Sequence, residues 1–143
     1  MLFRSWEYDP DFYDSILKQA EKLGQENKSE QAISLLEEVL DTHDCRLPAL
    51  RSSLETRLAR FYMNRGHTVK ALEYYSLAIE SFPGCLEAWK DMATHFLEEA
   101  EKSGAKDREK CKSATAYVRM VLLLAPSEGR EWQERLQKLP ASD

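Results

Sequence analysis

The chain has 143 residues, of which 43% are hydrophobic and 31% charged, with a formal net charge of −5 at pH 7. This length predicts one domain, and the hydrophobic fraction is sufficient for a core of packed helices. The acidic balance argues against binding to nucleic acid or to anionic membranes, because their phosphates attract cationic faces.

The first twelve residues are rich in aromatic side chains, including Phe3, Trp6 and Tyr8. Aromatic residues at such density either cover an apolar edge or anchor a partner. Because the first unit of a helical stack must hide its open face, we expect residues 1–12 to cap the fold. The alternative is that Phe3, Trp6 and Tyr8 dock into another subunit.

Residues 13–46 predict a first helical hairpin. Apolar and small residues recur there at helical spacing, and no segment longer than a few residues alternates as a strand would. The recurring residues are Ile16, Ala20, Leu23, Ala32, Leu36 and Val39. Asn27 stands where the chain has to turn between the two helices.

Residues 52–85 predict a second hairpin and carry the clearest pattern. Its small and apolar positions are Leu58, Ala59, Tyr62, Ala71, Tyr75 and Ala78. Gly66 stands at the turn, and Pro83 ends the second helix. Ala71 has to be small because the two helices approach closely there, so we expect Ala71 and Ala78 to be buried.

Residues 86–128 predict a third, longer hairpin. Trp89 and Ala114 are 25 positions apart, whereas Glu55 and Ala71 are 16 apart, so nine extra residues separate the third pair. We expect them around Gly104, between two extended helix ends. Residues 101–112 are polar, so these ends should make little core contact and tolerate shortening. Apolar residues after Pro126 then predict a closing helix; they are Trp132, Leu136 and Leu139.

The middle hairpin, with its length of ~34 residues and its small residues at close-contact positions, resembles one unit of the tetratricopeptide repeat (TPR) family. The resemblance extends over repeats at about 13–46, 52–85 and 86–128 and a cap at 129–140. It implies an all-α fold, a right-handed α-solenoid of three helix hairpins with a C-terminal capping helix. The middle repeat lacks only the leading tryptophan of the family, which Glu55 replaces.

The resemblance also implies where a partner binds. In TPR stacks the first helices of successive repeats line a concave groove that holds an extended peptide or a partner helix. The candidate groove residues of this chain are Arg57, Arg60, Asn64, Lys90, Thr94 and Arg130. Guanidinium groups bind carboxylates well, so an acidic protein segment is the expected partner. The alternative is that these charges are solvated and paired with Glu55, Glu87 and Asp91.

No sequence pattern predicts catalysis, a cofactor or a metal site. His43, Asp44 and Cys45 contain the ingredients of a nucleophile system, but adjacent side chains on a turn do not point at each other. The chain has no glycine-rich phosphate loop and no H-E-x-x-H pattern. We therefore expect a non-enzymatic scaffold or adaptor that needs no cofactor.

Three cysteines and the absence of apolar runs bear on localisation. Cys45, Cys85 and Cys111 are odd in number and form no C-x-x-C pair, which favours a reducing compartment. No stretch approaches the ~18 apolar residues of a membrane span, and the N-terminal sequence lacks the apolar region of a secretory signal. We expect a cytoplasmic protein, with the nucleus as the alternative.

Two other functions stay open at the level of sequence. The first is a subunit of an RNA-processing or kinetochore complex built from half-a-TPR repeats, although Gly66, Ala71 and Pro83 favour TPR units. The second is a structural homo-oligomer assembled through the aromatic N-terminal segment or an open end of the stack.

Overall fold

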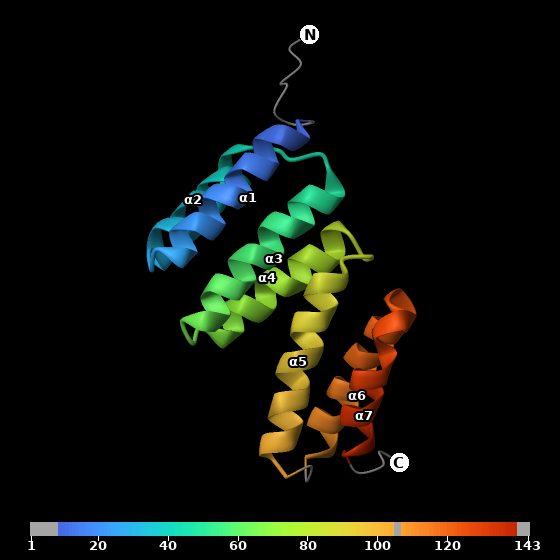
Figure 1. Ribbon diagram of the computed structural model, residues 1–143. Coiled ribbons are helices and arrows are strands. Elements are labelled where there is room, and N and C mark those ends of the chain that lie inside the picture. Colours follow the sequence, from blue (N-terminus) through green and yellow to red (C-terminus); the bar gives the residue numbers. More distant parts are fainter. Residues whose placement is uncertain (1–8, 105–106, 140–143) are drawn as a thin grey trace. The chain divides into compact units, whose positions relative to one another are not determined.

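The computed structural model of the protein describes residues 9–104 and 107–139. These residues form seven α-helices and one short 3-10 helix, and no strand occurs among them (Figure 1). The helices pack in adjacent pairs. The all-α class predicted from the sequence is therefore confirmed. The chain divides between Cys85 and Leu86 into two compact units, called here the first and the second unit.

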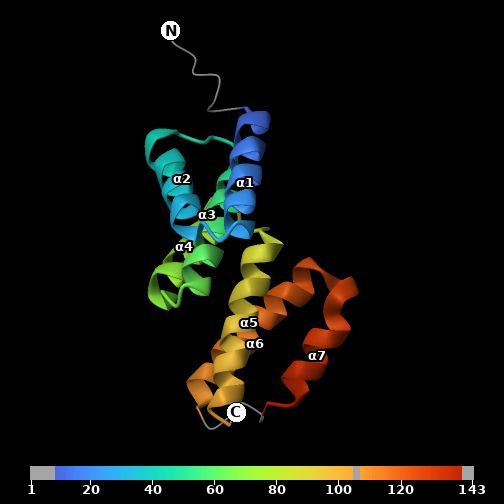
Figure 2. The same cartoon turned by 60° about the vertical axis from the view of Figure 1, so that its left-hand side comes forward.

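The first unit contains two helix pairs. Its helices are α1 (Pro10–Gln25), α2 (Ser29–Thr42), α3 (Pro48–Asn64) and α4 (Thr68–Ser81). α1 contacts both α2 and α3, and α3 contacts α4 (Figures 1 and 2). The core contains Tyr13, Leu36, Leu54 and Leu58, none of which has exposed surface. Burial of these side chains is the main force that holds the two pairs together.

α1 begins before the position expected from the sequence. The carboxylate of Asp9 accepts hydrogen bonds from the backbone N–H groups of Asp11 and Phe12, at 3.0 and 3.3 Å, and so caps the helix. Pro10 follows as the first helical residue, where its missing N–H costs nothing. The last residues of the expected N-terminal segment therefore belong to the first helix.

The α3–α4 pair is closely packed through small side chains. Ala59, Ala71 and Ala78 have no exposed surface, which confirms the predicted burial of Ala71 and Ala78. Gly66 provides the turn between these helices with a φ of 80°, a left-handed conformation that favours glycine. Asn27 adopts a φ of 61° in the turn between α1 and α2, and asparagine is among the few other residues that tolerate it.

A pair of tyrosines joins the two hairpins of the first unit. The hydroxyl groups of Tyr62 on α3 and Tyr74 on α4 both donate to one carboxylate oxygen of Glu37 on α2, at 2.9 and 3.0 Å. Their rings are stacked, with centroids 5.7 Å apart. Burial, and then the hydrogen bond to Glu37, raise the pKa of Tyr62 to about 12 and also raise the pKa of Tyr74.

The second unit is a helix pair with a closing helix. Its elements are α5 (Leu86–Lys102), α6 (Arg108–Leu124), η2 (Pro126–Glu128) and α7 (Gly129–Gln137). α5 packs along α6, and α7 follows η2 and packs against α6 (Figure 2). The buried core of this unit includes Ala93, Leu97, Val118 and Val121. The closing helix predicted from Trp132, Leu136 and Leu139 is present, and these three residues pack on that core.

The nine extra residues of the third hairpin are distributed over both helices and the turn. Counted from the aligned residues Glu55 and Trp89, α5 continues four residues further than α3, although both helices have 17 residues. The connection is two residues longer, and α6 begins three residues further ahead of Ala114 than α4 begins ahead of Ala71.

The expectation of little core contact is confirmed for most of residues 101–112, because the described ones other than Cys111 are exposed or half-buried. Cys111 is the exception and is buried, and Arg135 of α7 forms an ion pair with Glu101 at 3.0 Å. Because α7 covers this end of the pair, shortening should destabilise the second unit.

Among residues 9–104 and 107–139, no helix combines the length and the apolar character that a bilayer crossing requires.

The close packing at Ala71 yields a test of the helix register. Ala71→Glu should abolish cooperative folding of the first unit, because it combines overpacking with an unpaired buried charge. The expected loss is more than about 4 kcal/mol. Thermal unfolding followed by circular dichroism measures it, with Ser76→Glu on the exposed side of α4 as the matched control. An unchanged transition in Ala71→Glu would contradict this packing.

Candidate functional site

A hollow of about 300 Å³ lies on the first unit between α1 and α3. The last turns of α1 form one wall, the second half of α3 forms the other, and the first residue of α2 closes one end. The lining residues are Glu21, Gly24, Gln25, Ser29, Arg57, Arg60, Phe61 and Asn64. Arg57, Arg60 and Asn64 are candidate groove residues from the sequence, and the structure brings these three together.

Gly24 and Phe61 determine how closely the two walls approach. A Cβ atom at position 24 would lie 2.8 Å from Cε1 of Phe61, so any larger residue would displace the ring. Gly24 itself has an ordinary helical backbone, and glycine in a helix costs up to about 1 kcal/mol relative to alanine. The space that Phe61 requires is therefore the physical reason for glycine here.

The α3 wall is rich in hydrogen-bond donors. Arg57, Arg60 and Asn64 are three and four positions apart, so they share one helix face. Arg57 is half-buried, and within the described residues no ion pair joins it to another side chain. Gln25 and Ser29 add neutral donors on the opposite side, and Glu21 is the single acidic residue of the lining. The hollow thus combines two cations with several neutral donors.

The other three candidate groove residues lie in the second unit. Lys90 on α5 forms an ion pair with Glu128, and Arg130 on α7 forms one with Glu134 at 3.8 Å. Thr94 is half-buried on α5. The charges of Lys90 and Arg130 are therefore compensated inside their own unit. A groove that includes Lys90 together with Arg57 and Arg60 needs residues from both units and stays a prediction.

The predicted docking residues Phe3, Trp6 and Tyr8 lie outside the described residues.

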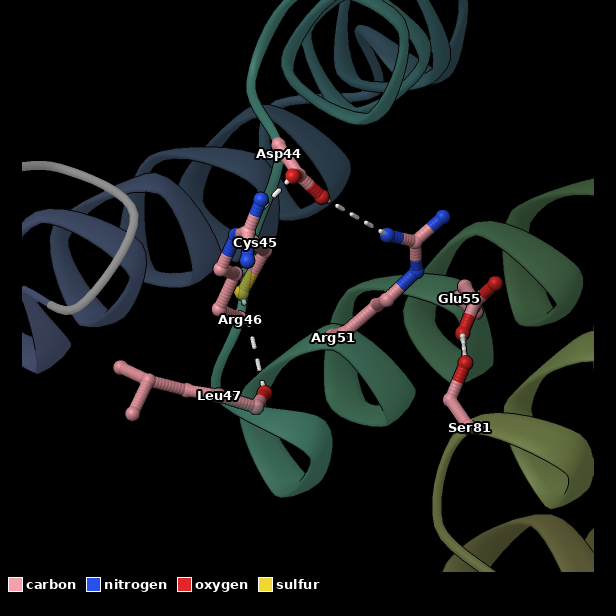
Figure 3. Close-up of polar contacts among 7 residues, drawn as sticks. All are labelled: Asp44, Cys45, Arg46, Leu47, Arg51, Glu55 and Ser81. Atoms are coloured by element: carbon pink, nitrogen blue, oxygen red, sulfur yellow. Dashed lines mark hydrogen bonds and ion pairs between the residues drawn. The ribbon is translucent and has the colours of Figure 1, made fainter. Parts of the chain in front are cut away.

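A second polar cluster lies at the start of α3 and the end of α4. Glu55 is only 3% exposed, and its Oε1 accepts a hydrogen bond from the Ser81 hydroxyl at 2.6 Å (Figure 3). Burial raises the pKa of Glu55, while the Ser81 hydrogen bond and the nearby Arg51 charge oppose the rise and Glu80 adds to it. The interpretation of Glu55 as a solvated charge is therefore wrong, because this residue occupies a helix–helix contact.

In the connection between α2 and α3, the side chains of His43, Asp44 and Cys45 each contact a different neighbouring group. Asp44 pairs with Arg46 at 3.1 Å and with Arg51 at 3.9 Å (Figure 3). The Cys45 thiol is buried and donates to the backbone carbonyl of Leu47 at 3.7 Å. His43 Nδ1 contacts the hydroxyl of Thr42 at 2.9 Å. These contacts hold the connection in place.

No group of histidine, cysteine and carboxylate side chains suited to a metal ion occurs in the part of the chain that the structure describes. No protein-family model matches the chain, and no curated protein is significantly similar to it. The fold and the hollow therefore carry the functional interpretation.

Sequence reasoning missed several residues of the hollow. Gly24, Gln25, Ser29 and Phe61 line it, although none of them was a predicted site residue. Only one feature of the sequence could have indicated a special role for Gly24. It is a glycine inside a helical pattern, and Asn27, not Gly24, makes the turn that follows. Phe61 carried no separate signal, because it follows Arg60 within an ordinary amphipathic helix.

The buried Glu55 carboxylate leads to a prediction about pH. Its pKa is higher in the folded than in the unfolded chain, so its contribution to stability is lost as the pH rises from the unfolded pKa, near 4.5, through the folded pKa. Glu55→Gln keeps an oxygen acceptor for Ser81 and removes the buried charge. At pH 7.5 it should stabilise the first unit by on the order of 1 kcal/mol, and the gain should shrink toward pH 4.5.

Thermal unfolding at the two pH values measures this gain, and Glu73→Gln, which changes an exposed carboxylate on α4, is the matched control. A variant less stable than the parent at pH 7.5 would show that the Glu55 charge is itself stabilising.

Proposed function

We propose that this chain is a non-catalytic interaction module of the TPR type, which binds an acidic segment of a partner protein in the hollow between α1 and α3. The observation that carries the proposal is the meeting of Arg57, Arg60 and Asn64 in that hollow. These residues were selected from the sequence because the first helices of TPR units line the binding groove. In this proposal α1 and α3 are two such first helices.

The arrangement of helix pairs supports the TPR assignment. α1, α3 and α5 begin at residues 10, 48 and 86, so successive helix pairs start at equal intervals of 38 residues along the chain. Small residues fill the close contact of the middle pair, as at Ala71 and Ala78. We accordingly propose three TPR-like hairpins, α1–α2, α3–α4 and α5–α6, in a right-handed solenoid that α7 closes.

The charge distribution supports an acidic partner. The whole chain carries a formal charge of −5, yet the hollow contains two arginines and one glutamate. A guanidinium group binds a carboxylate through two parallel hydrogen bonds, and partial burial strengthens such pairs. The proposed ligand is therefore an extended segment whose acidic side chains face Arg57 and Arg60. Binding of this kind requires no cofactor and fits a cytoplasmic or nuclear adaptor.

Charge reversal in the hollow tests the proposal. Arg57→Glu/Arg60→Glu should weaken binding of the partner more than about tenfold, because it replaces both attractive charges by repulsive ones. The binding of the parent should also weaken steeply between low and high salt. The parent chain first captures candidate partners from a lysate of the source cells. A purified partner segment is then titrated against parent and variant at two ionic strengths.

The matched control is Arg108→Glu/Arg119→Glu, which makes the same change in charge on the exposed face of α6. Circular dichroism of all three proteins verifies that they are folded. Equal affinities for the parent and the folded Arg57→Glu/Arg60→Glu variant would refute the proposed groove.

A further inference from the structure

We infer that the partner segment carries a basic residue directly beside its acidic residue, so that the basic side chain pairs with Glu21 and the acidic one with Arg57. This inference rests on the proposed function and narrows its ligand class from acidic segments to segments of mixed charge. It follows from the charges of the two walls, from their register and from the geometry of an extended chain.

The two walls of the hollow carry charges of opposite sign. Glu21 lines it from α1, and Arg57 lines it from α3. Two cations of α1, Lys18 and Lys22, line a separate hollow that α1 forms alone. Within residues 9–104 and 107–139, no ion pair joins Glu21 or Arg57 to another side chain. A ligand between the walls therefore meets a carboxylate on one side and a guanidinium group on the other.

The contact between Gly24 and Phe61 places these two charges at the same level of the hollow. α1 and α3 run in the same direction (Figures 1 and 2). Glu21 precedes Gly24 by three residues and Arg57 precedes Phe61 by four, which is about one helical turn in each case. Glu21 and Arg57 therefore lie opposite each other, one turn before the point where the walls meet.

An extended segment can contact both charges with two adjacent residues. Successive side chains of an extended chain point to opposite sides. A segment that lies lengthwise between α1 and α3 thus directs one side chain at α3 and the next at α1. When an acidic side chain faces Arg57, its neighbour faces Glu21. A second carboxylate there would be repelled, whereas a lysine or arginine would form an ion pair.

Four blocked heptapeptides test this arrangement. Each has a terminal glycine on both sides of five central residues. These are Ser-Glu-Lys-Glu-Ser in the first, Ser-Glu-Ser-Glu-Ser in the second, Ser-Glu-Glu-Glu-Ser in the third and Glu-Ser-Lys-Ser-Glu in the fourth. The fourth has the composition and charge of the first but directs its lysine and both glutamates to the same side. Each peptide is titrated into the full ¹⁵N-labelled chain, and the signals of the Arg57 Nε–H and the Glu21 amide are followed.

The first peptide should shift both signals and bind about threefold more tightly than the second, which is the scale of one exposed ion pair. The third should bind more weakly than the second, although it carries more negative charge, because its central carboxylate faces Glu21. The fourth should bind at least about threefold more weakly than the first. The advantage of the first peptide should shrink at high salt.

Variants of Glu21 test the role of this carboxylate. Glu21→Gln should make the first and second peptides bind equally, because the ion pair to lysine is lost. Glu21→Lys should reverse the order, so that the third peptide binds most tightly. Glu21 is exposed, so both variants should fold as the parent does, which circular dichroism verifies. The matched controls are Glu38→Gln and Glu38→Lys at an exposed position of α2, and they should keep the order of the parent.

The other outcomes would overturn the inference. If the third peptide bound the parent as tightly as the first, an acidic-segment groove would remain but the mixed-charge pairing would be refuted. Equal affinities for the first and second peptides, or for the first and fourth, would refute the adjacent basic residue. The order of the parent persisting in Glu21→Lys would refute the pairing with Glu21. No shift with any of the four peptides would contradict the proposed groove itself.

Discussion

The close packing of α3 against its neighbours is the constraint on which the rest of the first unit depends. One side of α3 contacts α4, where the Ser52 hydroxyl donates a hydrogen bond to the carbonyl of Ala78 at 2.8 Å. Another side buries Leu54 and Leu58 in the core. The remaining side carries Arg57, Arg60 and Asn64. The packing of α3 therefore decides that these polar residues line a hollow beside α1.

Polar contacts fix the orientation of the packed helices. Hydrophobic burial has little directionality, whereas the hydrogen bonds of Glu37 with Tyr62 and Tyr74 allow few relative positions of α2, α3 and α4. The contact of Glu55 with Ser81 acts similarly between α3 and α4 but includes a buried carboxylate. Such a group contributes to the specificity of the packing at a cost in stability that depends on pH.

Local rules predicted much of the fold. Helical spacing of apolar residues indicated the all-α class, and small residues at the close contact indicated the burial of Ala71 and Ala78. Two contacts between different helices could not be predicted from these local patterns. Residues 101–112 are mostly polar in sequence, yet α7 packs against α6 and Arg135 forms an ion pair with Glu101. Likewise, Gly24 meets Phe61 from another helix. Contacts between residues distant in sequence leave little trace in local periodicity, so neither could be predicted.

The central claim is that partner binding takes place in the hollow between α1 and α3, and site-specific photocross-linking locates binding directly. A benzophenone side chain replaces Phe61 inside the hollow in one variant and Val69, which is 74% exposed on α4, in the other. Both variants are irradiated in the source cells, and cross-linked partners are identified by mass spectrometry. The account predicts a discrete partner adduct from position 61 and little from position 69. Adducts from position 69 alone, or in equal yield from both positions, would contradict it.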